Sequence, residues 1–141
     1  MAFSDIYRVS GSAMSAQTVR LNTVASNLAN AETPAQAEGD VYKARHPVFA
    51  AVYQNDELMN DNALTGARVQ VLDVVQTGQS VKRYEPNHPM ADDNGFVYYP
   101  DINVVEEMAD MMSASRSFET NVDVLNNVKS MQQSLLRLGE A

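Results

Sequence analysis

The chain of 141 residues contains no cysteine, which excludes disulfide bonds, thiolate zinc sites and cysteine nucleophiles together. It also has no apolar run near the roughly 18 residues that a membrane span requires, so we expect no membrane insertion. Basic residues are few, 10 against 18 acidic ones, and the formal net charge is −8. Because phosphate binding needs clustered lysine and arginine, nucleic acid is not an expected partner.

Signals for targeting and for catalysis are also missing. The opening stretch MAFSDIYRVSGSAMSAQ has neither a basic segment nor a continuous apolar segment after it, so we expect no cleaved secretory signal. Phosphate-binding and dinucleotide-binding glycine motifs, zinc-protease motifs and nucleophile elbows do not occur. We therefore expect no enzyme activity, no cofactor and no small-molecule substrate.

Proline and glycine are scarce at both ends and concentrated in the middle, which predicts helices flanking a β-rich part. From Ser4 to about Ala31, apolar side chains recur every seven residues at Tyr7, Met14, Leu21 and Leu28, with Val24 beside them. Such spacing is typical of a helix with a narrow apolar seam. Thr33 and Pro34 should end this helix, since the residue before proline disfavours helical geometry.

The middle segment, about residues 35 to 100, carries short runs with β propensity. Residues 69–75 and 81–84 are separated by QTGQS, and residues 96–99 follow the turn signal Asp93, Asn94, Gly95. These spacings predict a small antiparallel sheet with hairpins. The polar stretch 55–66, NDELMNDNALTG, is expected to form an exposed loop.

The last segment, residues 102 to about 138, has no proline or glycine and should form one helix about 55 Å long. A helix of this length cannot pack wholly on a small sheet, so its seam must meet another helix. We predict an α+β fold in which the N-terminal and C-terminal helices form an antiparallel, coiled-coil-like pair with a small β-rich insertion between them. The corresponding domains are 1–34, 35–100 and 101–141.

Two groups of polar residues could be interpreted as chemical sites. His46, His88 and Asp92 could be ligands of a metal-dependent enzyme, but three or four convergent ligands are needed and an Asx turn closing a hairpin also explains Asp92. The carboxylates Glu106, Glu107 and Asp110 could form an acid–base cluster, or they could favour the positive end of a helix dipole. In both cases we favour the structural interpretation.

Asparagine and serine within the apolar stripes need a different explanation. A small or amide side chain in a helix seam can fix the register of packing at a cost in stability. Alternatively, these residues could lie on a solvated helix face.

The segment LNTVASNLANAETP, residues 21–34, resembles the N-terminal signature shared by axial proteins of the bacterial flagellum, which include rod, hook and hook-associated subunits. The run from Tyr84 to Met131, together with YKARHPVF at 42–49, is similar to the more specific pattern of proximal rod proteins of the FlgC type. Two departures are Phe118, where tyrosine is commoner, and AQAEGDV at 35–41, which replaces a glycine-rich approach.

The resemblance implies a structural subunit of the flagellar rod, with terminal helices lining a hollow helical assembly and a small β domain outside. It also implies export by the flagellar type III apparatus without a cleaved signal, and polymerisation with itself and with other rod proteins across the periplasm. Another rod or hook-type axial subunit is the alternative within this class. The residues predicted to form the assembly interface are Tyr7, Met14, Leu21, Val24, Asn27, Leu28, Asn30, Val104, Met108, Met111, Ser115, Phe118, Asn121, Val122, Leu125, Val128, Met131 and Leu135.

Overall fold

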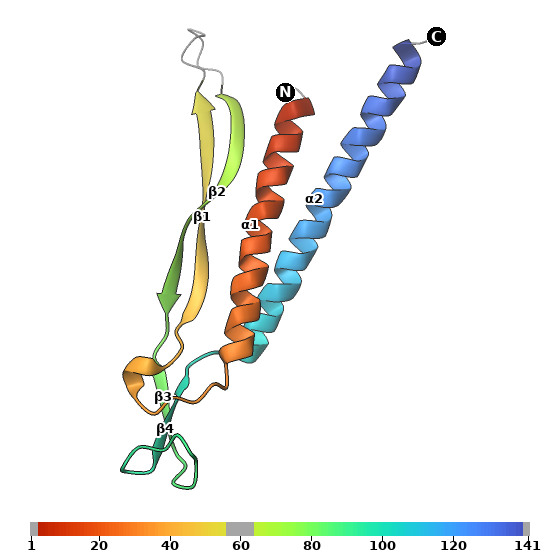
Figure 1. The fold of residues 1–141 in the computed structure, drawn as a ribbon. Helices are drawn as coiled ribbons and strands as arrows, with labels where there is room; N and C mark the ends of the chain where they lie inside the picture. Colours follow the sequence, from red (N-terminus) through yellow and green to blue (C-terminus); the bar gives the residue numbers. More distant parts are fainter. Residues whose placement is uncertain (1–2, 56–63, 140–141) are drawn as a thin grey trace.

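The structure is a computed structural model, and it describes residues 3–55 and 64–139. Two helices lie side by side, and a twisted β ribbon runs along the first of them (Figure 1). A second, shorter ribbon extends from the end of the helix pair where the first helix finishes. The elements in chain order are α1 (Phe3–Asn30), the short 3-10 helix η1 (Glu38–Asp40), β1 (Ala44–Asn55), β2 (Leu64–Thr77), β3 (Ser80–Tyr84), β4 (Phe96–Pro100) and α2 (Val104–Gly139).

The two helices are antiparallel, and α2 is the longer, with 36 residues against 28 in α1. The end of α1 and the start of α2 each have a local cause. Helix α1 ends at Asn30, shortly before Thr33 and Pro34. Helix α2 begins after Asn103, whose Oδ1 accepts hydrogen bonds from the backbone N–H groups of Val105 (3.1 Å) and Glu106 (3.4 Å), which is the geometry of an N-cap. The predicted α+β arrangement with a helix pair is confirmed. Within the described residues, neither helix is long and apolar enough to cross a membrane.

The strands pair differently from the prediction. Strand β2, which includes residues 69–75, pairs antiparallel with β1 and not with residues 81–84. Those residues belong to β3, which pairs with β4. Gly78, whose φ of 117° favours glycine, lies in the two-residue connection between β2 and β3, where the chain passes from the first ribbon into the second. The prediction of a hairpin around QTGQS was therefore wrong.

The segment 55–66, predicted to be an exposed loop, belongs to strands at both of its ends. Asn55 still belongs to β1, and β2 begins at Leu64. The residues between them, 56–63, lie outside the described residues. A register shift between Val48 and Phe49 leaves Leu72 as the extra residue of β2, a bulge that sharpens the twist of the ribbon.

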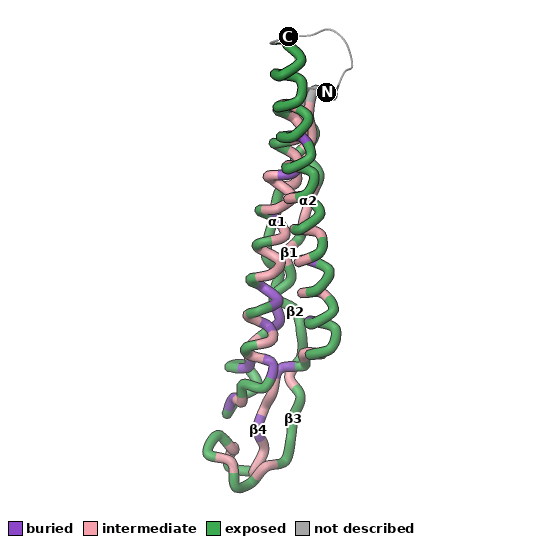
Figure 2. Tube along the Cα trace, turned by 90° about the vertical axis from the view of Figure 1, so that its right-hand side faces the viewer, coloured by how far each residue is buried: buried purple, intermediate pink, exposed green. Residues whose placement is uncertain are grey.

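The core is thin and made of small side chains. Figure 2 shows buried segments around the lower half of α1 and its junction with the strands, whereas the far end of α2 is exposed. Leucine, methionine and phenylalanine side chains of the helix seam are at most half-buried. The buried apolar residues are Ala16, Val24, Ala31, Ala35, Val41, Ala44, Val97, Ala114 and Val128. An elongated subunit with so small a core leaves much apolar surface for contacts outside itself.

Candidate assembly surfaces

Asn27 of α1 joins three parts of the subunit. Its side chain is fully buried, and its amide nitrogen donates to the backbone carbonyl of Arg45 in β1 (3.0 Å) and to Oε2 of Glu107 in α2 (3.1 Å). Its amide oxygen accepts from the backbone N–H of Arg45 (2.9 Å) and from the hydroxyl of Tyr42 (3.0 Å). All the hydrogen-bonding capacity of the amide is therefore used inside the subunit.

The same amide replaces a neighbouring strand at the start of β1. By bonding both the N–H and the carbonyl of Arg45, the side chain of Asn27 satisfies the outer edge of the strand as a backbone partner would. Tyr42 extends the network, since its hydroxyl donates to Asn27 and must accept from Ser26 Oγ (3.0 Å). The guanidinium of Arg45 lies over the Tyr42 ring, 5.7 Å from its centroid. We call the set Ser26, Asn27, Tyr42, Arg45 and Glu107 the joint.

The three carboxylates at the start of α2 have different environments. Glu107 is 6 % exposed and belongs to the joint. Asp110 forms an ion pair with Arg20 of α1 (2.9 Å), and Glu106 is exposed. Glu107 and Asp110 each bond to a side chain of α1, so these two carboxylates connect the helices.

Both ends of the helix seam contain buried as well as exposed residues. Near one end of the pair, the Tyr7 hydroxyl donates to Gln132 Oε1 (3.2 Å), and near the other end Arg20 pairs with Asp110. Of the residues predicted for the interface, Val24, Asn27 and Val128 are buried; Met14, Leu21, Leu28, Asn30, Met111, Ser115, Phe118, Asn121, Val122 and Leu125 are half-buried; and Tyr7, Val104, Met108, Met131 and Leu135 are exposed.

Small residues that the sequence analysis did not select are among the most deeply buried in the helices. Ala114 is 0 % exposed and Ala16 is 3 % exposed. A small side chain lets neighbouring backbones approach closely, and a seven-residue pattern of large side chains does not reveal such positions. The polar seam residues also differ among themselves, because Asn30 and Asn121 donate to carbonyls four residues earlier in their own helices. They make no cross-element bond in the described part of the chain.

The β1–β2 ribbon crosses α1 and contacts it through both strands. At the lower end Asn27 covers the edge of β1, as described above. Further along α1, Ser12 Oγ accepts a hydrogen bond from the backbone N–H of Val69 in β2 (3.0 Å). Figure 1 shows the same crossing, with β1 beside α1 at one end of the ribbon and β2 beside it at the other. Two-stranded ribbons twist strongly, and this twist lets one helix protect parts of both edges.

The β3–β4 ribbon is stabilised by charged side chains lying over aromatic rings. The Lys82 ammonium lies 4.1 Å from the Phe96 centroid, and the Arg83 guanidinium lies 4.7 Å from the Tyr99 centroid. The Tyr99 hydroxyl donates to Glu85 Oε2 (3.2 Å), and burial together with this carboxylate raises the pKa of Tyr99. Basic side chains along the edge strand also discourage pairing with another strand.

The possible metal ligands do not form a site in the structure. His46 lies exposed on β1, whereas His88 and Asp92 lie in the connection between β3 and β4. Over residues 3–55 and 64–139, no group of three or more histidine or acidic residues is arranged to hold a metal ion. Instead, Asp92 Oδ1 accepts from the backbone N–H groups of Asn94 (2.9 Å) and Phe96 (2.8 Å). The interpretation of Asp92 as an Asx turn is confirmed.

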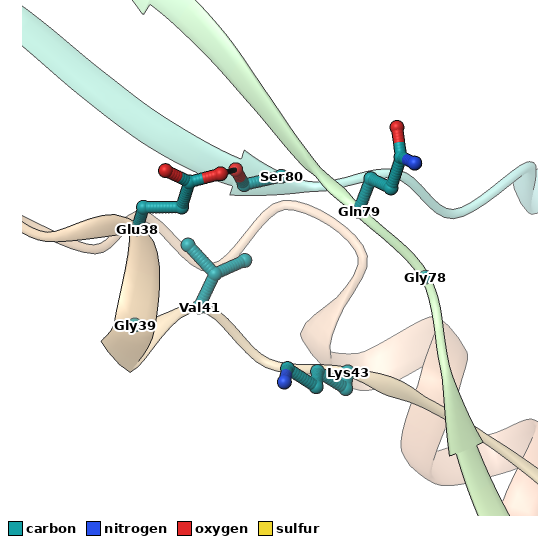
Figure 3. Close-up of a pocket in the computed structure, with 7 residues that line it drawn as sticks. All are labelled: Glu38, Gly39, Val41, Lys43, Gly78, Gln79 and Ser80. Atoms are coloured by element: carbon teal, nitrogen blue, oxygen red, sulfur yellow. Dashed lines mark hydrogen bonds between the residues drawn. The ribbon is translucent and has the colours of Figure 1, made fainter.

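An open hollow of about 550 Å³ lies between η1 and the connection from β2 to β3. In Figure 3, Glu38 and Ser80 point toward each other and Gln79 points away; the Ser80 hydroxyl donates to Glu38 Oε1 (3.0 Å). The hollow is lined by one carboxylate, that of Glu38, and one ammonium, that of Lys43, and otherwise mostly by small side chains and backbone. This arrangement ties η1 to β3 and offers no convergent set of ligand-binding groups.

Comparisons with known proteins identify the family. Residues 8–34 match the family model described as flagella basal body rod protein, and residues 93–138 match flagellar basal body rod FlgEFG protein C-terminal. The flagellar basal-body rod protein FlgC of Escherichia coli O6:H1 is 44 % identical over 144 residues, covering 99 % of this chain and 100 % of the relative. The chain belongs to the FlgC family of flagellar basal-body rod proteins.

Further FlgC relatives cover nearly the same length. The protein of Salmonella typhimurium is 44 % identical over 141 residues, with 99 % of this chain and 100 % of the relative covered. That of Borreliella burgdorferi is 34 % identical over 148 residues, with 96 % of each chain covered. The resemblance predicted from residues 21–34, 42–49 and 84–131 is thus confirmed, and the chain is a structural subunit of the flagellar rod.

The two family models fall on the two helices of this FlgC-family chain. The match at 8–34 covers most of α1 and includes the joint residue Asn27, and the match at 93–138 covers β4 and nearly all of α2. The exposed apolar residues of α2 therefore lie inside a segment typical of flagellar rod proteins. They are the clearest candidates for contacts between subunits, and the most exposed are Val105, Met108, Met112, Met131, Leu135, Leu136 and Leu138.

Proposed function

We propose that this FlgC-family subunit polymerises with other rod proteins through its helix pair, forming a hollow shaft that transmits torque from the motor to the hook. The observation that carries the proposal is the apolar surface left open at both ends of α2. A shaft needs many cooperative side-chain contacts and no chemistry, and a long helix with open apolar stripes supplies such contacts.

The proposal divides the predicted interface residues into two groups. The buried members Val24, Asn27 and Val128 hold the subunit together, and the exposed members offer side-chain surface to neighbouring subunits. We propose the corresponding division of the chain into assembly helices, residues 1–34 and 101–141, and an outer β-rich part, residues 35–100. The exposed members are Tyr7, Val104, Met108, Met131 and Leu135.

Substitutions at positions 125 and 123 of α2 test this role of the helix pair. Leu125 is half-buried, so Leu125→Asp places a charge in the apolar seam, at a typical cost of several kcal/mol. Asp123 is exposed, and Asp123→Ala should change stability by about 0.5 kcal/mol or less. Cells with Leu125→Asp as their only copy should build no functional rod, and cells with Asp123→Ala should swim. If cells with Leu125→Asp and cells with Asp123→Ala both swam normally, the helix pair would not be the element that drives assembly.

We also propose that the subunit leaves the cytoplasm through the flagellar type III export apparatus without N-terminal processing. Cleavage after Ala13 or Ala16 would remove Tyr7 and its hydrogen bond to Gln132, and with them the first turns of α1. Mass spectrometry of the protein from purified basal bodies should find a terminus at Met1 or Ala2. A terminus at residue 14 or 17 would instead indicate conventional secretion.

A further inference from the structure

Asn94 is the one asparagine in the sequence that is followed by a glycine. It is an exposed residue of the connection between β3 and β4, at the tip of the ribbon that extends beyond the helix pair (Figure 1). An asparagine–glycine step is chemically reactive, because the glycine nitrogen can attack the asparagine side chain with no Cβ in its way. The dipeptide therefore carries a reactivity that its role in a turn does not explain.

The reaction open to Asn94 is deamidation. The backbone nitrogen of Gly95 loses its proton to a solvent base and forms a bond to Cγ of Asn94. The bond from Cγ to Nδ2 breaks, and the amide NH2 group takes up a proton and leaves as ammonia. Water then opens the cyclic imide at either of its carbonyl carbons, which leaves aspartate or isoaspartate at position 94. Water is the only co-reactant.

Hydrogen bonds of the folded turn oppose the attacking step. The N–H of Gly95 donates to the backbone carbonyl of Asp92 (2.9 Å), so the attacking nitrogen is held in a reverse turn. The side chain of Asp92 also accepts from the N–H groups of Asn94 (2.9 Å) and Phe96 (2.8 Å), which fixes the backbone on both sides of Gly95. The nitrogen can reach Cγ only after the backbone at position 94 has rotated, and this rotation breaks the turn.

The turn requires glycine at position 95 for a separate, steric reason. Gly95 has a φ of 81°, and a Cβ there would lie 3.0 Å from Cε2 of Tyr84 and 3.2 Å from Cβ of Pro86. Any larger residue would be strained in its backbone and crowded by these two side chains. The fold therefore keeps the glycine that makes Asn94 reactive, and the contacts of Asp92 counter that reactivity.

We propose that Asn94 is a site of spontaneous deamidation and that the turn at Asp92 suppresses the reaction in the folded subunit. Chain that stays unfolded loses the amide, whereas folded chain keeps it. Either product adds a carboxylate beside Asp92 and Asp93, and like charges repel. Isoaspartate also lengthens the backbone by a methylene group, which displaces the Gly95 N–H from the Asp92 carbonyl. Deamidation before folding thus weakens the connection between β3 and β4.

Peptide mass spectrometry of the purified full chain measures the reaction. One sample is kept folded in mildly alkaline buffer, and another is unfolded in guanidinium chloride at the same pH and ionic strength. Asn87 is the internal control, because it is exposed in the same connection but is followed by a histidine. Unfolded chain should lose the Asn94 amide at least about tenfold faster than folded chain, since the folded turn must open before the attack. In the unfolded sample Asn94 should also react faster than Asn87. Equal rates for Asn94 in the two samples, or for Asn94 and Asn87 in unfolded chain, would overturn the proposal.

Substitutions at positions 92 and 93 test the protecting contacts. Asp92→Ala removes the side-chain acceptor of two N–H groups, so deamidation of folded chain at Asn94 should become about threefold faster or more. Asp93→Ala removes an exposed carboxylate one residue away and should leave the rate within about twofold. In guanidinium chloride both variants should react at the rate of the parent, which separates loss of the turn from any change in the chemistry. If folded Asp92→Ala lost the amide no faster than folded Asp93→Ala, the side chain of Asp92 would not protect Asn94 and this part of the proposal would be wrong.

Discussion

Asn27→Leu should lower the free energy of unfolding of the isolated subunit by about 3 kcal/mol or more. The substitution keeps the approximate size of the side chain but removes hydrogen-bond partners from Arg45, Tyr42 and Glu107. Each buried polar group left unpaired costs about 1–3 kcal/mol, and more if it is charged. Urea unfolding followed by far-ultraviolet circular dichroism measures the difference.

Asn22→Leu is the matched control, because Asn22 is an exposed residue of the same helix. It should change stability by about 0.5 kcal/mol or less. A sharper test uses Asn27→Asp, which places a second carboxylate where the amide now lies 3.1 Å from Glu107. Adding Glu107→Gln should restore much of the lost stability, since an amide can donate to the new carboxylate. If Asn27→Leu and Asn22→Leu were equally stable, the joint would have no role in stability.

The helices could be predicted from the sequence because their signals are local. A seven-residue apolar repeat, a proline after α1 and a long segment free of proline and glycine predict both helices and their antiparallel pairing. The Asx turn at Asp92 was also predictable, since that side chain bonds to backbone groups two and four residues further on. Each of these features depends on residues close to one another in the chain.

Strand pairing was harder to predict because it depends on distant segments. Strand β1 contains Pro47 and the polar residues Arg45 and His46, so its alternation of apolar and polar residues is too weak to predict a strand. Without a signal for β1, the sequence predicts that β2 pairs with the nearest β-prone run, residues 81–84. In the structure β2 pairs with β1, and Gly78 lies in the short connection that leads from this ribbon into the next.

The candidate site was predicted in part. The stripe of large apolar residues on α2 was found, but the sequence could not show which members face α1 and which remain exposed, since that depends on where α1 begins. Asn27 was selected as a polar residue that fixes register, yet its partners Arg45 and Glu107 lie 18 and 80 residues away in the chain. No short-range pattern could reveal that its amide joins two helices to a strand.

Val128→Asp should separate the two helices, and it has a closely matched control one turn earlier. Val128 is 3 % exposed in α2, whereas Val124 is 37 % exposed on the same helix. An unpaired carboxylate at position 128 would be buried with no described partner, which typically costs about 3–5 kcal/mol. Val124→Asp introduces the same charge and the same change of helix propensity, so it should cost about 1 kcal/mol or less.

The expected result for Val128→Asp is loss of the bond between Tyr7 and Gln132 and faster amide hydrogen exchange along the first half of α1, while the β3–β4 ribbon keeps its exchange rates. This pattern follows because the ribbon contains its own hydrogen bonds and cation–π contacts, which do not involve the helix seam. If exchange in α1 were equally fast in the Val124→Asp variant, burial at position 128 would not be what holds the pair together. The comparison therefore isolates the packing of α1 on α2 from the general effect of a new charge on α2.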